Sequence, residues 1–98
     1  MESIIQFIQL DTDERAKQLD LEKIEQLSKK YDWLIKADVF FKEEKVSNGK
    51  GKICEIRLSC PGPRLFTSSN KENFTVSVAE TIRDLEIQLE KRKSEMKR

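Results

Sequence analysis

The chain contains no histidine, and its 98 residues include only three glycines, two prolines and two cysteines. Without histidine, the side chain that most often acts as a general base near neutral pH is missing. Gly49, Gly51 and Gly62 do not form a glycine-rich phosphate loop, and no Gly-x-Ser-x-Gly motif occurs. Most carboxylates alternate with lysines along predicted helices, which is typical of a solvated face. We therefore predict no catalytic residues, no small-molecule substrate and a binding protein instead of an enzyme.

The two cysteines, Cys54 and Cys60, lie in one predicted strand. A strand rises about 3.3 Å per residue, so the six steps from Cys54 to Cys60 separate them by about 20 Å, which is beyond the reach of a disulfide. Both are predicted to be buried thiols in a reducing compartment. Because no Cys-x-x-Cys pair accompanies them, the sequence predicts neither a transition-metal site nor a cofactor.

Long hydrophobic runs are also missing, and none approaches the roughly 18 residues that a bilayer span needs. The N-terminal segment MESIIQFIQLDTDER has an acidic second residue and no cationic region, unlike a signal peptide. We expect a cytoplasmic protein without a membrane partner.

Charge is what the chain has in abundance: 38% of its residues are ionic, yet the net charge is only +1. With 37% hydrophobic residues, the chain can build a thin core that is covered on one side. The length favours one domain over residues 1–98. Any nucleic-acid binding therefore depends on where the positive charges gather, because the total is close to zero.

The longest regular stretch is residues 73–98, which contains neither glycine nor proline. Its apolar residues recur every three or four positions and predict one buried helix face, with Asn73 as N-cap: Val78, Ile82, Leu85 and Leu89. Beyond Glu90 the helix turns cationic, with only Glu95 opposing the positive side chains Lys91, Arg92, Lys93, Lys97 and Arg98. Such a basic end either complements the helix dipole or forms a binding surface.

The remaining segments alternate between the two regular patterns. A second helix is predicted from residue 14 to about residue 30, with a buried face formed by Ala16, Leu21, Ile24, Leu27 and Tyr31. Strands are predicted at residues 3–10, 35–41, 53–60 and 65–69, and the second of them should bury Ile35, Ala37, Val39 and Phe41. A charged hairpin loop at residues 42–52 joins the second and third strands, and Pro61-Gly62-Pro63 forces the next turn.

The predicted order is β-α-β-β-β-α, which makes an α+β two-layer sandwich. Its four-stranded mixed sheet has both helices packed on one face, and the first strand runs parallel to its neighbour because a helix connects them. The other sheet face should present Phe40, Ile53 and Arg57. We interpret Phe40 against Ile53 as a cross-strand pair, with a partner-binding patch as the alternative.

Basic residues cluster twice, once late in each helix: Lys23, Lys29 and Lys30, then Lys91, Arg92 and Lys93. Because both helices cover the same sheet face, the two clusters can form one stripe that meets a phosphate backbone. The aromatic strand motifs of single-stranded RNA binders are missing, so recognition of folded RNA by shape and charge is favoured.

The chain resembles the ribosome hibernation-promoting factors, a family also called ribosome-associated inhibitor, protein Y or sigma-factor modulation proteins. The segments that carry the resemblance, in order, are Leu27-Ser28-Lys29-Lys30-Tyr31-Asp32, Ala37-Asp38-Val39-Phe40-Phe41-Lys42-Glu43, Glu55-Ile56-Arg57-Leu58, Pro61-Gly62 before Leu65-Phe66, and Gln88-Leu89 before Lys91-Arg92-Lys93. The match covers the whole chain, and the chain is similar to the short form of the family, without a second domain that dimerises ribosomes.

The resemblance implies a stress-response protein that binds the small ribosomal subunit near the decoding centre. There it would exclude mRNA and tRNA and so inhibit translation in idle cells. It would act as a monomer off the ribosome, contacting rRNA phosphates through positions that match the family: Lys23, Lys29, Lys30, Lys42, Lys91, Arg92 and Lys93.

The final helix departs from the family pattern, since acidic or apolar residues stand where basic ones are typical: Asp84, Glu86, Ile87 and Glu90. Two alternatives stay open at this stage. A general double-stranded RNA-binding domain would bind any duplex, and a protein-interaction module using the open sheet face would bind independently of salt.

Overall fold

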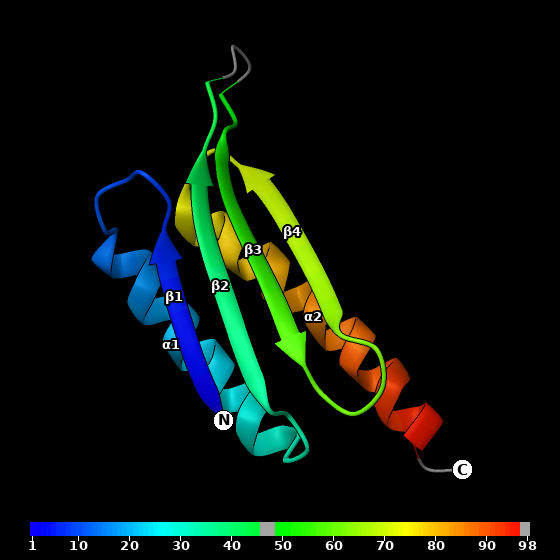
Figure 1. Ribbon diagram of the computed structural model, residues 1–98. Coiled ribbons are helices and arrows are strands. Elements are labelled where there is room, and N and C mark those ends of the chain that lie inside the picture. The colour runs from blue at the N-terminus through cyan, green and yellow to red at the C-terminus, as the bar shows by residue number, and fades with distance from the viewer. Residues whose placement is uncertain (46–48, 97–98) are drawn as a thin grey trace.

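The computed structural model describes residues 1–45 and 49–96 of the chain. Within these ranges the chain alternates between strands and helices in the predicted order (Figure 1). The elements are β1 (Glu2–Phe7), α1 (Glu14–Lys30), β2 (Lys36–Glu43), β3 (Lys52–Ser59), β4 (Leu65–Lys71) and α2 (Phe74–Met96). The predicted hairpin loop includes residues 46–48, and the predicted helix end includes residues 97–98, which lie outside the described ranges.

The four strands form one sheet in the order β1-β2-β3-β4. β1 pairs with β2 in parallel, whereas β2, β3 and β4 form an antiparallel meander. Both helices lie side by side across one face of the sheet (Figure 1). This arrangement confirms the α+β two-layer sandwich and the parallel first strand. β1 ends at Phe7, earlier than expected, and β4 extends to Lys71, later than expected.

Helix α2 follows its sequence pattern closely. Asn73 caps its start, because the Asn73 Oδ1 atom accepts a hydrogen bond from the Val76 amide at 2.9 Å. The predicted apolar face is buried as expected: Val78, Ile82, Leu85 and Leu89. Two polar residues, Ser77 and Thr81, extend this buried face, and each directs a hydroxyl to a β3 carbonyl. Polar side chains thus bind the sheet backbone where the helix crosses it.

Helix α1 begins after Asp13, whose Oδ1 atom accepts from the Ala16 amide at 3.1 Å. Its buried face is Ala16, Asp20, Ile24, Leu27 and then Tyr31 at the C-cap. The prediction that Leu21 belongs to this face is wrong, since Leu21 is only partly buried and Asp20 takes the buried position. From Ile24 a step back of four residues gives Asp20, and a further step of four gives Ala16.

The start of β2 also differs from the prediction. Ile35 was expected to be buried, but 60% of its surface is exposed, and Leu34 is buried in its place. Strand alternation holds only inside the ladder, which begins at Lys36. Leu34 belongs to the preceding turn, where its amide donates to the Tyr31 carbonyl at 3.2 Å. The turn therefore sets the direction of these two residues.

The face of the sheet opposite the helices carries a mixture of apolar and charged side chains. Phe40, Ile53 and Arg57 belong to this face as predicted, but Phe40 does not pair with Ile53. Phe40 lies opposite Glu55, and Ile53 lies opposite Lys42. The Arg57 guanidinium instead packs over the Phe40 ring, with 5.2 Å between the guanidinium carbon and the ring centroid.

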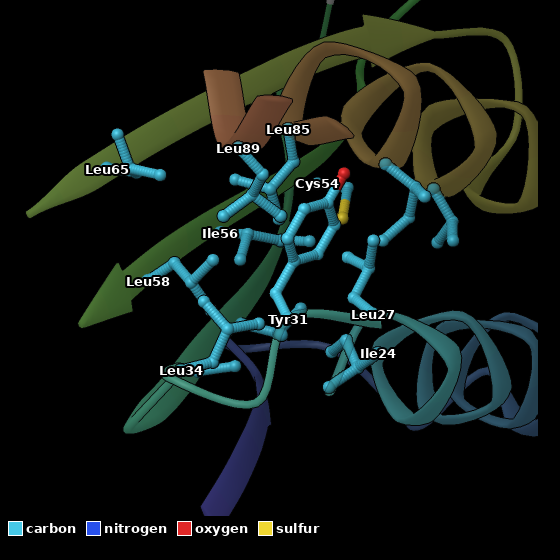
Figure 2. Packing of buried hydrophobic residues seen from close by; sticks show 14 of the residues in the cluster. Ile24, Leu27, Tyr31, Leu34, Cys54, Ile56, Leu58, Leu65, Leu85 and Leu89 are labelled. Atoms are coloured by element: carbon cyan, nitrogen blue, oxygen red, sulfur yellow. The ribbon is translucent and has the colours of Figure 1, made fainter. Parts of the chain in front are cut away.

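The core fills the space between the sheet and the two helices (Figure 2). Tyr31 projects from the end of α1 toward α2, among Leu34, Ile56, Leu85 and Leu89. At the other end of the core, the rings of Phe7 and Phe41 stack with their centroids 4.5 Å apart. The two cysteines are both free and buried, which confirms that part of the prediction. Their side chains share the inner face of the sheet with Ile56 and Leu58.

Candidate nucleic-acid interface

The α1 cluster lies at the last turns of that helix. Lys29 is exposed and forms an ion pair with Glu25, one turn earlier, at 3.4 Å. Lys30 is also exposed, and both lysines complement the negative end of the helix dipole. Lys23 is partly buried and lies on the side of α1 that faces α2. The cluster is therefore divided between two directions, with Lys23 in the groove between the helices.

The C-terminal end of α1 is tied to the middle of α2. The Tyr31 hydroxyl donates a hydrogen bond to the Glu90 carboxylate, and the Lys30 Nζ atom lies 3.9 Å from the same carboxylate. Desolvation, this hydrogen bond and the charges of Glu90 and Glu86 together raise the pKa of Tyr31 to about 12. Tyr31 is therefore a neutral donor at physiological pH, and Glu90 offsets the charge of Lys30.

The α2 cluster does not form one patch, because consecutive helix residues project about 100° apart. Arg92 points into the molecule: its Nη1 atom donates to the carbonyls of Pro61 at 2.8 Å and Pro63 at 2.9 Å. Only 15% of its side chain is exposed. The guanidinium fixes the turn between β3 and β4, and Gly62 permits this contact. A Cβ atom at Gly62 would lie 3.0 Å from Nη1, and its φ of 89° also favours glycine.

Lys91 and Lys93 flank Arg92 and project to either side. Lys91 is exposed and lines a shallow hollow beside β4 with Gln88, Leu65 and Glu95. Gln88 itself donates to the carbonyl of Phe66 on β4 at 3.1 Å. Lys93 is partly buried, one helical turn after Glu90. The three neighbouring cations thus face three surfaces of the helix end.

Lys42 lies away from all of these residues. It belongs to β2 and points to the open face of the sheet, where its Nζ atom pairs with Glu55 at 3.1 Å. The seven predicted site residues therefore do not share a surface. Lys23, Lys29, Lys30, Lys91 and Lys93 lie on the helical layer, Arg92 holds a turn, and Lys42 lies on the opposite side of the sheet.

A groove runs between the two helices and brings together residues that sequence reasoning had not combined. It is lined by Lys23 from α1 and, from α2, by Ala79, Ile82, Arg83, Glu86 and Ile87. Arg83 was not predicted as a site residue, although it is exposed and precedes Glu90 by two helical turns. Its Nη1 atom lies 3.7 Å from Glu80. Lys23 and Arg83 give the groove two cations, opposed by Glu86.

The sequence profile of the family described as Sigma 54 modulation protein / S30EA ribosomal protein matches residues 3–97. The chain therefore belongs to this family, as the resemblance noted from the sequence predicted. A comparison with curated protein sequences finds no significant match.

Solved structures share the fold of this chain. A ribosomal subunit interface protein from Coxiella burnetii is similar at a TM-score of 0.81 and 19% identity, covering 96% of this chain and 99% of that one. The Thermus thermophilus Protein Y N-terminal domain is similar at a TM-score of 0.68 and 18% identity, with coverages of 92% and 93%. At these identities the likeness establishes the fold.

Membrane spans and metal sites are two further kinds of feature that the described residues could offer. Neither α1 nor α2 combines the length and the apolar character that a bilayer-spanning helix needs. Within residues 1–45 and 49–96, no three histidine, cysteine or acidic side chains come together in a way that would hold a metal ion.

Proposed function

We propose that this chain is a ribosome hibernation factor of the cytoplasm. As a single domain and a monomer off the ribosome, it binds the small subunit near the decoding centre. By occupying that site it blocks mRNA and tRNA, and so inhibits translation in idle or stressed cells. The observation that carries the proposal is the family match over residues 3–97, which leaves almost none of the chain unmatched.

The proposed contact surface is the outer side of the two helices. Lys23 and Arg83 form its centre, because both line the groove and neither is drawn into the protein interior. Lys29, Lys30 and Lys93 extend this surface toward the C-terminal ends of the helices, and Lys91 provides an outlying contact. Arg92 is assigned a role in stabilising the fold, because its guanidinium donates hydrogen bonds to the carbonyls of Pro61 and Pro63. Lys42 is not assigned to this surface because it lies on the other side of the sheet.

Sedimentation with purified small subunits over a series of salt concentrations tests the proposal. Phosphate contacts make log affinity fall linearly with log salt, by about 0.7–0.9 per contact. The double variant Lys23→Gln/Arg83→Gln should flatten the slope by roughly 1.4 to 1.8 and weaken binding. The matched control Lys36→Gln/Lys42→Gln removes the same charge from the open sheet face and should change the slope little.

Three outcomes would contradict the proposal in different ways. Equal affinity for small subunits and for an unrelated RNA duplex would favour a general double-stranded RNA-binding domain. Binding that does not respond to salt would favour a protein-interaction module on the open sheet face. A larger effect of the Lys36/Lys42 control than of the groove variant would place the contact surface on the sheet.

A further inference from the structure

Among the residues that the structure describes, the core contains one acidic residue without a hydrogen-bond partner. Asp20 is fully buried, and neither of its carboxyl oxygens has a hydrogen-bond partner. It lies on α1 between Ala16 and Ile24, each four residues away on the same buried face. An ionised carboxylate is among the groups most costly to remove from water unless a charge or hydrogen bonds compensate. Asp20 has no such compensation.

The elements packed around Asp20 do not supply a charge. The buried residues of α2 are all neutral: Phe74, Ser77, Val78, Thr81, Ile82, Leu85 and Leu89. The inner face of the strands is apolar apart from Thr67 on β4, and its titratable groups are two buried thiols, Cys54 on β3 and Cys60 just beyond it. Burial, followed by the nearby Asp20 carboxylate, raises the pKa of Cys54 far above its usual range, so this thiol stays neutral. The Thr81 hydroxyl beside it already donates to the carbonyls of Ser77 at 2.7 Å and Cys54 at 3.2 Å.

Cations on α1 itself do not neutralise Asp20 either. Lys17 and Lys23 lie three residues before and after it, and both are partly exposed. In the part of the chain that the structure describes, no lysine or arginine nitrogen lies within ion-pairing distance of the Asp20 carboxyl. The carboxyl group is thus enclosed by neutral groups from both helices and the sheet.

We propose that Asp20 acts as a proton-operated switch in the packing of α1. With Asp20 as a neutral carboxylic acid, α1 docks fully against α2 and the sheet; when Asp20 ionises, this packing loosens. Because Lys23 follows Asp20 by one helical turn and lines the groove with Arg83, loosening α1 would also change the spacing of these two cations. The switch itself does not depend on the proposed function.

The direction of the pH effect follows from linkage. Desolvation raises the pKa of Asp20 to about 7, whereas an unfolded aspartate titrates near 3.8. Between these values the folded chain keeps a proton that the unfolded chain releases. The free energy of unfolding therefore falls as pH rises from about 4 to about 7, and it levels off above that range. Acidification from pH 8 to pH 5 should strengthen the fold.

Urea unfolding of the full chain between pH 5 and pH 8 measures this effect. From pH 5 to pH 8 the unfolding equilibrium constant of the wild type should rise roughly 50- to 100-fold more than that of Asp20→Asn or Asp20→Ala. The control Asp84→Asn, at an exposed position on α2, should keep the wild-type pH dependence. A ratio between wild type and both Asp20 variants that stays within about twofold would overturn the proposal, because linkage requires it to change.

A direct titration makes the test independent of how the variants fold. The carboxyl carbon resonance of Asp20 in the wild-type protein should titrate with a midpoint near 7. A midpoint near that of an ordinary aspartate, about 4, would mean that the buried group stays ionised in the folded state, and the switch would not exist.

Discussion

Leu85 and Ile87 lie two residues apart on α2 in opposite environments. Leu85 is fully buried between the helices and the sheet, whereas 66% of the Ile87 surface is exposed. Leu85→Ala should lower the free energy of unfolding by roughly 2–5 kcal/mol, through lost burial and the cavity left behind. The matched control Ile87→Ala should cost less than about 1 kcal/mol. Urea denaturation of both variants measures the difference, and equal losses would mean that α2 is rotated from its described position.

Both thiols should be protected from reagents in the folded protein. Cys54 is completely buried, Cys60 is 7% exposed, and burial raises the pKa of each above the ordinary thiol value. Because the thiolate is the reactive form, a maleimide at pH 7 should label neither cysteine in the native protein and both in urea. Mass spectrometry counts the labels. Rapid native labelling of Cys54 would show that β3 presents its other face to the helices.

Single buried residues are where the sequence was least informative. The apolar residues of α1 are compatible with either Leu21 or Asp20 on the buried face, because both lie within one turn of Ile24. Hydrophobicity alone selects Leu21, since an unpaired buried carboxylate is costly. The helix instead keeps its four-residue steps through Ala16, and Asp20 is carried into the core. A residue that breaks the hydrophobic pattern was therefore the hardest to place and the most informative.

At the scale of whole elements, one side chain joins the end of α2 to the turn between β3 and β4. Arg92→Gln removes charged hydrogen bonds to two carbonyls, each worth about 1.5–3 kcal/mol when buried and less here because the site is partly solvated. We expect a net loss of roughly 1–2 kcal/mol in the free energy of unfolding. Cys60 should also react more slowly with thiol reagents, because the Arg92 guanidinium lies 3.4 Å from its sulfur and lowers the thiol pKa, so that removing it leaves less thiolate.

Lys91, the residue before Arg92, provides the control for this prediction. Lys91→Gln removes the same charge from an exposed position and should leave both stability and Cys60 labelling within experimental error. If Lys91→Gln and Arg92→Gln destabilise the fold equally, the turn does not depend on the guanidinium. Any measurement of RNA binding with Arg92 variants must therefore be read beside their stability.

The elements themselves could be predicted well, whereas strand register could not. Period-two and period-3.6 patterns correctly identified four strands, two helices and their buried faces, with the exceptions noted at Leu21 and Ile35. The pairing of Phe40 with Ile53 was wrong by two residues, since Phe40 lies opposite Glu55. A two-residue shift leaves every side chain on its own face, so hydrophobic alternation cannot detect it. The length of the hairpin loop decides the register instead.

At the scale of the whole molecule, acidic residues interrupt the positive charge of the helical layer. Glu86 is exposed in the same groove as Lys23 and Arg83. If the groove meets rRNA phosphates as proposed, Glu86→Gln should tighten small-subunit binding, by roughly two- to tenfold at low salt, because like-charge repulsion is removed. Glu2→Gln, an equal change at an exposed position of β1, should have little effect. Weaker binding by Glu86→Gln in a sedimentation assay would contradict the proposed contact surface.

Sequence reasoning located the basic clusters but could not show their directions. Lys91, Arg92 and Lys93 read as one cationic run, yet their side chains leave the helix on different sides. The internal role of Arg92 requires a turn that is 29 residues away in sequence to come within hydrogen-bonding distance. Arg83 was overlooked because it stands alone between acidic residues, and only the packing of α1 beside it supplies the second cation.

The incomplete burial of β1 has a consequence for local unfolding of the protein. This strand is bonded on one side only, in parallel to β2, and none of its residues is fully buried. The meander of β2, β3 and β4 is bonded locally and covered by α2, whereas β1 depends on a partner beyond a whole helix. Local opening should therefore begin at β1, and its amides should exchange with deuterium earlier than those of β3. The N-terminal strand should then be the first to separate from the sheet.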